Sequence, residues 1–536
     1  MSRWTHRLRA QSYSRRFIWK SAIAILLGGM ALGLIAQLLF QHSGRTASRE
    51  LIFDLSNPGY EYLGNSNRSL QTLPDALVQY LKTPELDVES FLEIDSLIAP
   101  YLRGDDRERL EALLVERFGQ TTGDLLGAYL KAISDPEGAS RQALEETASR
   151  EPPPRYANRL LGQLEMKARR YHRAHPYFKR EGIFPDAETA RFLAIETLRY
   201  DERYDELRAL LEQPDYQVYL TPSLKLELAK HQRDWLGVAS ALPAYLFLQF
   251  DWRMAAIAGI AALVWAALLL RLGQIDSWLG KAGGLGWLAF LAGAASVMPT
   301  LFLVILQDAY VGYDPSGDDD ILRIGAYFIG GVGLREEFCK LLLFLPFAIR
   351  LARKGNELDA LIIASFVGLG FAAAENISYF AQTAGLAAPA RFLTANFFHI
   401  ALTGMGGLYL CRALRGQGWN DFLYIFGIMI VVHGLYNTLL SLPNFPEGSF
   451  LAMIVFILLS MYYFRELYAL NAHTRPAYSL SFLFVCGLCL ILSSVIVFQS
   501  AQIGLYMALR IIVPETLGVI IIIFMFFREF NEALGE

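Results

Sequence analysis

The ionisable side chains inside the apolar stretches of this sequence are few, and their types suit hydrolytic chemistry. A charged group at the centre of a membrane helix costs about 2.5–3.5 kcal/mol on insertion scales, so each is a candidate for a functional site. The set comprises Glu336, Glu337, Lys340, Glu375, His399 and His433, with Arg510 and Glu515 in the last span. The polar amides of Asn376 and Asn437 lie beside Glu375 and one helical turn from His433. Buried carboxylates and imidazoles can activate water, and polar donors can stabilise the resulting oxyanion.

The spacing of these residues places several of them together. Lys340 follows Glu336 by four residues and Glu337 by three, so all three share a helix face and the ammonium can keep a carboxylate ionised. His433 and Asn437 are also one helical turn apart.

Depth in the bilayer is a second test of whether these groups can meet. At about 1.5 Å per residue, Glu375, His399 and His433 lie roughly 8–12 Å from the outer ends of their spans, whereas Glu336 lies near 18 Å. The Gly330-Gly331-x-Gly333 stretch can break or tilt this helix, which would bring the glutamate pair nearer to the other residues.

The same residue types also suit a metal centre. Glutamate and histidine bind zinc, and bound zinc lowers the pKa of its water, so Glu336, Glu337, Glu375, His399 and His433 are candidate ligands. Glutamate-dependent and zinc-dependent hydrolysis both remain open. A third interpretation is a polar network that only joins the helices.

The composition shows what kind of protein carries these residues. Hydrophobic residues make up 54% of the 536 residues and charged residues 19%, which is too apolar for an ordinary soluble enzyme. Residues 41–252 hold 26 Lys and Arg against 34 Asp and Glu, a local charge of −8, and the rest of the chain is sparsely charged. A soluble insert therefore interrupts a membrane protein, and the overall charge of −4 argues against a nucleic-acid partner.

The hydropathy pattern predicts an all-α fold, a polytopic helix bundle of about ten spans in the lipid bilayer. The spans lie near 21–40, 254–270, 285–307, 324–349, 358–380, 391–411, 421–440, 450–464, 479–498 and 503–527. Arginine and lysine are concentrated in the N-terminal flank and in alternate loops, which predicts that both termini are cytoplasmic and residues 41–252 extracytoplasmic. The predicted parts are a basic N-terminus (1–20), an anchor (21–40), the exported domain (41–252), a catalytic core (253–449) and additional C-terminal helices (450–536).

The exported domain contains a recurring pattern. Tyr171, Tyr204 and Trp235 each follow a short charged turn between two helical stretches, at intervals of 33 and 31 residues. These intervals are close to the period of tetratricopeptide-like helix pairs. We therefore expect an α-helical, TPR-like domain that acts either as a docking surface or as a spacer.

Four motifs in the membrane part resemble the PrsW family of intramembrane proteases, in the wider group of the CAAX prenyl endopeptidases. They are E-E-x-x-K at Glu336, F-x-x-x-E from Phe371 to Glu375, a lone histidine at His399, and H-x-x-x-N at His433. The resemblance implies cleavage of membrane-anchored proteins, such as an anti-sigma factor, at the extracytoplasmic side of a bacterial inner membrane.

The resemblance also implies roles for individual residues. Glu336 or Glu337 would activate water, Glu375 and His399 would assist, and His433 with Asn437 would stabilise the oxyanion. A proton-coupled transporter that uses the same buried Glu and His residues is the main alternative, and Arg510 and Glu515 in the last span could form a relay. A non-catalytic scaffold is the other.

Overall fold

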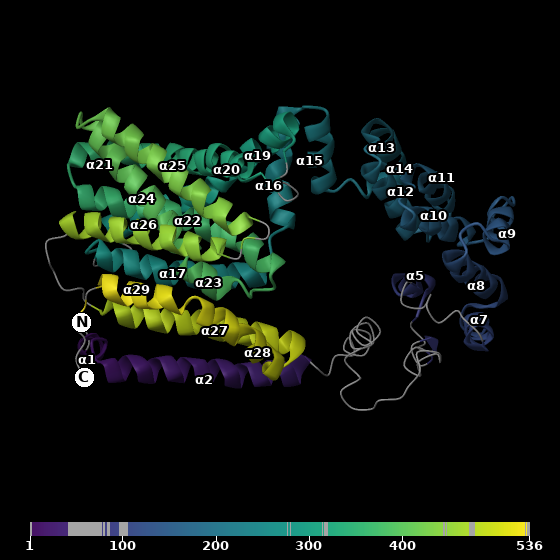
Figure 1. Cartoon of the computed structure of the whole chain (residues 1–536), viewed down its shortest axis with the longest axis horizontal. Helices are drawn as coiled ribbons and strands as arrows, with labels where there is room; N and C mark the ends of the chain where they lie inside the picture. The colour runs from purple at the N-terminus through teal and green to yellow at the C-terminus, as the bar shows by residue number, and fades with distance from the viewer. Residues whose placement is uncertain are drawn as a thin grey trace. The chain divides into compact units, whose positions relative to one another are not determined.

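The computed structural model describes residues 3–40, 78, 81–82, 86–95, 105–275, 277–278, 280–313, 315, 320–442, 445, 447–470, 478–530 and 532. Residues 41–77, which begin the predicted exported domain, lie outside this set. All elements in the described part of the chain are helices, as expected. They form two compact units, which we call the membrane unit (1–41 and 232–536) and the second unit (42–231) (Figure 1).

The membrane unit contains a succession of long apolar helices. Its elements are α1 (Arg3–Gln11), α2 (Arg15–Phe40), α16 (Trp235–Leu248), α17 (Trp252–Leu272), α18 (Lys281–Ala295), α19 (Val297–Val311), α20 (Ile321–Ala326), the π-helix η4 (Tyr327–Gly333), α21 (Leu334–Lys354), α22 (Glu357–Gln382), α23 (Ala388–Leu393), α24 (Ala395–Leu414), α25 (Trp419–Ser441), α26 (Gly448–Leu470), α27 (Leu480–Ile503), α28 (Leu505–Gly518) and α29 (Ile520–Phe530).

Among the described residues, eight helices are long and apolar enough to cross a membrane. A ninth is added if the bent pair Leu505–Thr516 and Ile520–Phe530 forms one span. The polytopic helix bundle is therefore confirmed, while the count of ten crossings stays a prediction. The helix α21 is not among the eight, because it carries the charged residues that define the candidate site.

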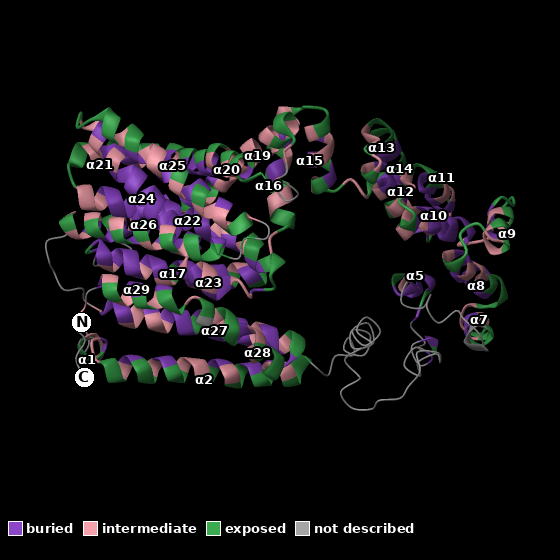
Figure 2. Ribbon diagram, viewed as in Figure 1, coloured by how far each residue is buried: buried purple, intermediate pink, exposed green. Residues whose placement is uncertain are grey.

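The helices α22 and α24 form the buried centre of the membrane unit (Figure 2). A Cβ atom on Gly368 would lie 2.1 Å from the carbonyl oxygen of His399, and one on Gly370 would lie 1.9 Å from that of Phe290. Glycine at these crossings lets the backbones touch, as is common between membrane helices. This packing sets the position of Glu375, which lies further along α22, relative to His399.

A second glycine contact fixes the start of α21. A Cβ atom on Gly434 of α25 would lie 2.3 Å from the Cα atom of Ile329, and one on Gly333 would lie 2.6 Å from the carbonyl oxygen of Ile430. The glycine-rich stretch forms the π-helix η4, so the expected departure from regular helix is confirmed. Because η4 leads directly into α21, this contact brings Glu336 and Glu337 up to His433.

The second unit is a series of short helices. They are α5 (Val88–Glu93), α7 (Asp105–Phe118), α8 (Gln120–Ser134), α9 (Ala139–Ala148), α10 (Ala157–Lys167), α11 (Tyr171–Glu181), α12 (Glu188–Tyr200), α13 (Tyr204–Leu211), α14 (Pro214–Gln217) and α15 (Pro222–His231). Consecutive helices pack against one another around buried leucines and aromatic side chains.

The predicted recurring turn is visible in the backbone. Arg169 and Glu202 both have φ 55°, and each is followed by a residue whose N–H donates to a carbonyl five residues back, at 2.9 Å. Arg233 has the same φ before α16. The same left-handed turn therefore joins α10 to α11 and α12 to α13, and a residue with the same φ lies between α15 and α16. A TPR-like classification stays a prediction.

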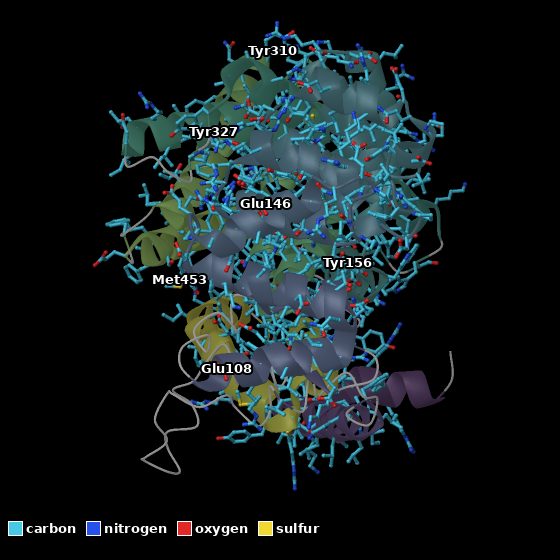
Figure 3. All side chains as sticks on the ribbon, turned by 90° about the vertical axis from the view of Figure 1, so that its right-hand side faces the viewer. Glu108, Glu146, Tyr156, Tyr310, Tyr327 and Met453 are labelled. Atoms are coloured by element: carbon cyan, nitrogen blue, oxygen red, sulfur yellow. The ribbon has the colours of Figure 1, made fainter. Side chains whose placement is uncertain are left out.

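The helix α16 belongs to the membrane unit rather than to the second unit. Its Trp235 contacts the rings of Phe302 and Tyr310 on α19, with ring centroids 6.5 and 5.6 Å apart. Tyr310 is labelled in Figure 3. The helix is apolar, and Leu236 and Phe247 are exposed on it.

Buried ion pairs stabilise the second unit. The carboxylate of Glu165, 1% exposed, pairs with Arg141 and with Arg170. Burial alone raises the pKa of Glu165, but the hydrogen bonds and charges of these two arginines outweigh it and hold the pKa below its ordinary value of 4.5.

Candidate functional site

Polar side chains from α21, α22, α23, α24 and α25 meet inside the membrane unit. They form a continuous series of contacts, in which Glu336 Oε2 lies 3.6 Å from His433 Nε2 and His433 Nδ1 lies 2.8 Å from Glu337 Oε1. Lys340 Nζ lies 2.9 Å from Glu337 Oε1 and 2.8 Å from His399 Nδ1. His399 Nε2 lies 3.3 Å from Glu375 Oε2, which lies 2.5 Å from Arg391. The difference in depth estimated for Glu336 therefore does not keep it away from the histidines.

Lys340 occupies the middle of this network and is completely buried. Its ammonium lies 3.4 Å from Glu336 and 2.9 Å from Glu337, and 3.9 Å from the centroid of the Phe371 ring. An isolated buried ammonium is strongly unfavourable, so the two carboxylates and the cation–π contact are what allow it here. Phe371 of the F-x-x-x-E motif thus has a defined role beside the lysine.

The two adjacent glutamates are in different surroundings. Glu337 is 2% exposed and is contacted by Lys340, His433 and the hydroxyl of Thr403, the last at 3.4 Å. Glu336 is 8% exposed, and its closest polar contacts are the longer ones to Lys340 and His433. Glu336 is therefore the carboxylate with acceptor capacity left for a water molecule.

The neighbours of each histidine define its tautomer. An ammonium group only donates, so Lys340 requires Nδ1 of His399 to accept, which leaves the proton on Nε2 facing Glu375. For His433, the carboxylate of Glu337 faces Nδ1, which therefore carries the proton. Nε2 of His433 points towards a second carboxylate, that of Glu336, and is the ring nitrogen left to donate to a substrate oxygen when it also carries a proton.

Arg391 is a site residue that the sequence did not reveal. It lies on α23, donates to Glu375 and to the Asn376 side chain, and stacks 3.7 Å from the centroid of the Tyr379 ring. Asn376 in turn donates to Asn396 at 2.6 Å. The only sequence signal was that Arg391 is a lone basic residue between two apolar spans, and its spacing from Glu375 gave no reason to pair them.

Other predicted residues lie apart from the network. Asn437 is half-buried one turn after His433 and makes no hydrogen bond to another side chain in the described part of the chain. Arg510 and Glu515 are exposed on α28, and neither is ion-paired with a described residue. The proposed relay between them therefore has no support from the geometry.

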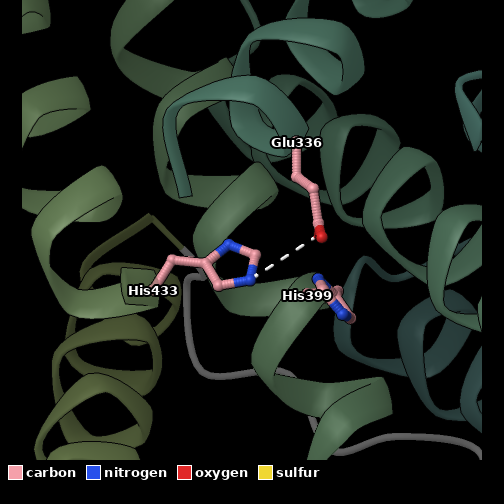
Figure 4. Close-up of side chains that lie close together, drawn as sticks. All are labelled: Glu336, His399 and His433. Carbon is pink, nitrogen blue, oxygen red and sulfur yellow. Dashed lines mark ion pairs between the residues drawn. The ribbon is translucent and has the colours of Figure 1, made fainter. Parts of the chain in front are cut away.

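Three of the five candidate metal ligands form a compact cluster. Glu336, His399 and His433 each offer a ligand atom within 4.8 Å of the others (Figure 4). Two histidines and a glutamate match a catalytic zinc site, although zinc bonds of about 2.0–2.2 Å would require these atoms to move closer together. His399 would also have to exchange a present hydrogen bond for the metal.

The other two candidate ligands lie behind the histidines. Glu337 contacts Nδ1 of His433, and Glu375 contacts Nε2 of His399. Carboxylates in such positions orient the imidazoles of zinc-binding histidines. The donor set thus fits zinc chemically, with Glu337 and Glu375 as supporting residues rather than ligands.

Comparison with known proteins shows which proteins this part of the chain resembles. Residues 282–463, which contain the whole network, match the family described as PrsW family intramembrane metalloprotease. Protease PrsW of Oceanobacillus iheyensis is 29% identical over 157 residues, which cover 28% of this chain and 68% of that protein. No solved structure matches the chain. Together with the helix bundle and the four motifs, these matches confirm that residues 282–463 resemble the PrsW family of intramembrane proteases.

Proposed function

We propose that this protein hydrolyses peptide bonds of membrane-anchored proteins near the extracytoplasmic side, with Glu336 as the residue that activates water. The observation that carries the proposal is the unbroken series of contacts from Glu336 to Glu375 through two histidines and Lys340. A purely structural network has no need for two oriented imidazoles beside a carboxylate that has acceptor capacity left for water.

In this mechanism Glu336 accepts a proton from water as the oxygen attacks the scissile carbonyl carbon. Glu336 then gives that proton to the leaving amine. The amide of Asn437, which no other described side chain engages, donates to the oxyanion together with His433. His399, whose two ring nitrogens contact Lys340 and Glu375, packs against the His433 ring and assists by positioning it. Lys340 and Glu337 hold the two imidazoles in place.

A metal-dependent reaction is the second candidate, favoured by the Glu336, His399 and His433 cluster and by the description of the matching family. Bound zinc would supply a water of lowered pKa and polarise the carbonyl. In that case Glu337 and Glu375 orient the two ligand histidines, and Lys340 offsets the charge of Glu337.

The orientation of the chain in the membrane and the role of the second unit are proposed from the sequence. The distribution of basic residues favours cytoplasmic termini and an extracytoplasmic second unit, in a bacterial inner membrane by family resemblance. We assign the second unit to docking of the substrate, which by the same resemblance is a protein like an anti-sigma factor. The repeated helical turns of this unit support such a surface.

The test is cleavage of a single-span substrate by the purified full chain in lipid vesicles. Glu336→Gln and His433→Ala should each abolish cleavage without lowering the amount of folded protein. Glu515→Gln is the matched control, since it removes an exposed membrane glutamate that is outside the network. Persistent cleavage by Glu336→Gln would contradict the proposal.

A further inference from the structure

A cavity of about 290 Å³ lies beside the site, between α19 and the η4–α21 segment, and Arg335 forms part of its wall. We propose that this cavity is a specificity subsite that binds an acidic side chain of the substrate, close to the scissile bond. This inference rests on the proposed function. Arg335 would hold the substrate carboxylate.

The state of Arg335 is the first argument. The residue is 8% exposed, its Nη1 donates to the side-chain oxygen of Gln307 at 2.6 Å, and its Nε is buried with no hydrogen-bond partner. No described carboxylate lies within ion-pair distance of it. Lys340, the other buried cation on α21, is in contrast matched by two carboxylates. A buried guanidinium with an unused donor and no described carboxylate at ion-pair distance is costly, and an anionic ligand in direct contact lowers that cost.

The wall of the cavity is the second argument. Val304, Ile305 and Val311 of α19 line it, as does Tyr327 at the start of η4 (Figure 3). A Cβ atom on Gly331 would lie 2.7 Å from the side-chain nitrogen of Gln307, so a glycine at this position leaves room for the amide that contacts Arg335. The cavity thus combines apolar walls with a fixed donor group, as binding pockets do.

The position of Arg335 on α21, next to Glu336, is the third argument. Arg335 directly precedes Glu336, and consecutive helix residues point about 100° apart. One side chain therefore faces the cavity while the next faces His433. An extended peptide advances about 3.3–3.6 Å per residue, so a group held by Arg335 lies within a few residues of the bond at Glu336.

The chemistry favours a carboxylate over a phosphate group. A guanidinium forms paired hydrogen bonds with a carboxylate, and a single negative charge matches the single positive charge of Arg335. Asp308 also lines the cavity, and its charge disfavours a doubly charged phosphomonoester more than a carboxylate.

The experiment uses the full chain in neutral-lipid vesicles with a set of single-span substrates. One acidic residue is moved through about five positions on each side of the cleaved bond and is compared with the matching amide at every position. We expect one position at which the acid raises kcat/KM by about 10- to 100-fold over the amide. In Arg335→Gln this ratio should fall to about one, while Arg350→Gln, an exposed arginine on the same helix, should retain it.

A variant with the charge at position 335 reversed controls for the possibility that Arg335→Gln is misfolded. Arg335→Glu should reverse the preference and favour a lysine at the same substrate position, a result that a damaged protein cannot give. Equal cleavage of acidic and neutral substrates by the wild type would overturn the subsite while leaving the proposed function intact, whereas no cleavage at all would overturn the proposed function. A dependence on Arg335 that follows the anionic lipid content of the vesicles, and not the peptide, would also overturn the subsite.

Discussion

Lys340 Nζ lies 2.8 Å from His399 Nδ1, so a lysine at the centre of the bundle decides which nitrogen of the histidine carries the proton. The same ammonium is 2.9 Å from Glu337, which in turn fixes His433. One cation thus sets the orientation of both imidazoles. Tautomer and orientation are the properties that decide whether a histidine can assist hydrolysis.

The two glutamates should respond differently to replacement by glutamine. Glu336→Gln should lower activity by about 10²- to 10⁴-fold with little effect on stability, because Glu336 makes only long polar contacts. Glu337→Gln should also destabilise the fold, by about 3 kcal/mol, because it removes the charge that matches Lys340. Activity in vesicles and unfolding in detergent measure the two effects. Equal loss of stability in both variants would contradict the distinction.

Lys340 and Glu337 should be strongly coupled energetically. Lys340→Met leaves a buried carboxylate without its cation and should cost about 3–5 kcal/mol of the free energy of unfolding. The double variant Lys340→Met with Glu337→Gln should recover about half of that loss or more, because neither charge remains unmatched. Additive losses in this cycle would show that the contact carries no coupling.

The glycine contact between η4 and α25 should be required for activity. Gly434→Ala places a methyl group against the backbone at Ile329, pushes η4 away and separates Glu336 from His433. A shift of about 1 Å at a catalytic group can cost about 10²-fold in rate. Gly427→Ala on the same helix is the control, since its Cβ would meet no atom within 4 Å. Full activity of Gly434→Ala would refute the positioning role of this contact.

Some of this arrangement could be predicted from the sequence and some could not. Glu336, Lys340, Glu375 and His433 stood out because charged groups are rare in apolar spans. Spacing along one helix predicted the contacts of Lys340 with Glu336 and Glu337, which the structure confirms.

Contacts between residues on different helices could not be predicted from the sequence in the same way. The pairing of Arg391 with Glu375 joins a short helix to a long one, and no periodicity relates them. Depth counted along straight helices placed Glu336 too far from His433, because that count cannot include the π-helix and the glycine contact that shift the start of α21. The different exposure of Glu336 and Glu337 likewise depends on packing against α24 and α25.

Lys340 and a divalent metal should compete for His399. Nδ1 of His399 accepts from the lysine, and the ammonium places a positive charge within the Glu336, His399 and His433 cluster. Lys340→Gln should therefore raise the affinity for zinc by about tenfold, measured by titration against a chelator of known affinity. Lys354→Gln, at the exposed end of α21, is the control. Weaker zinc binding in Lys340→Gln would exclude this competition.

The second unit should lose stability in acid through Glu165. Its folded-state pKa lies below the ordinary value of 4.5, so the unfolded chain binds the proton more readily than the folded one. The stabilisation is complete above the ordinary value and is lost as the pH falls through the folded-state value. Hydrogen exchange of α10 in the full chain should accelerate over this range, and Glu165→Gln should flatten that pH dependence. An unchanged pH profile in the variant would assign the acid sensitivity to other groups.

The site is divided between helices that meet different surroundings. Glu375 and His399 lie on α22 and α24, most of whose residues are buried, whereas His433 lies on α25, which has few buried residues (Figure 2). Lateral pressure from lipid therefore acts on α25 directly and reaches α22 and α24 only through their neighbours. We therefore expect a change in bilayer thickness or acyl-chain order to disturb the spacing of His433 and Glu336 first, so that the rate of turnover depends on the surrounding lipid as well as on the chain.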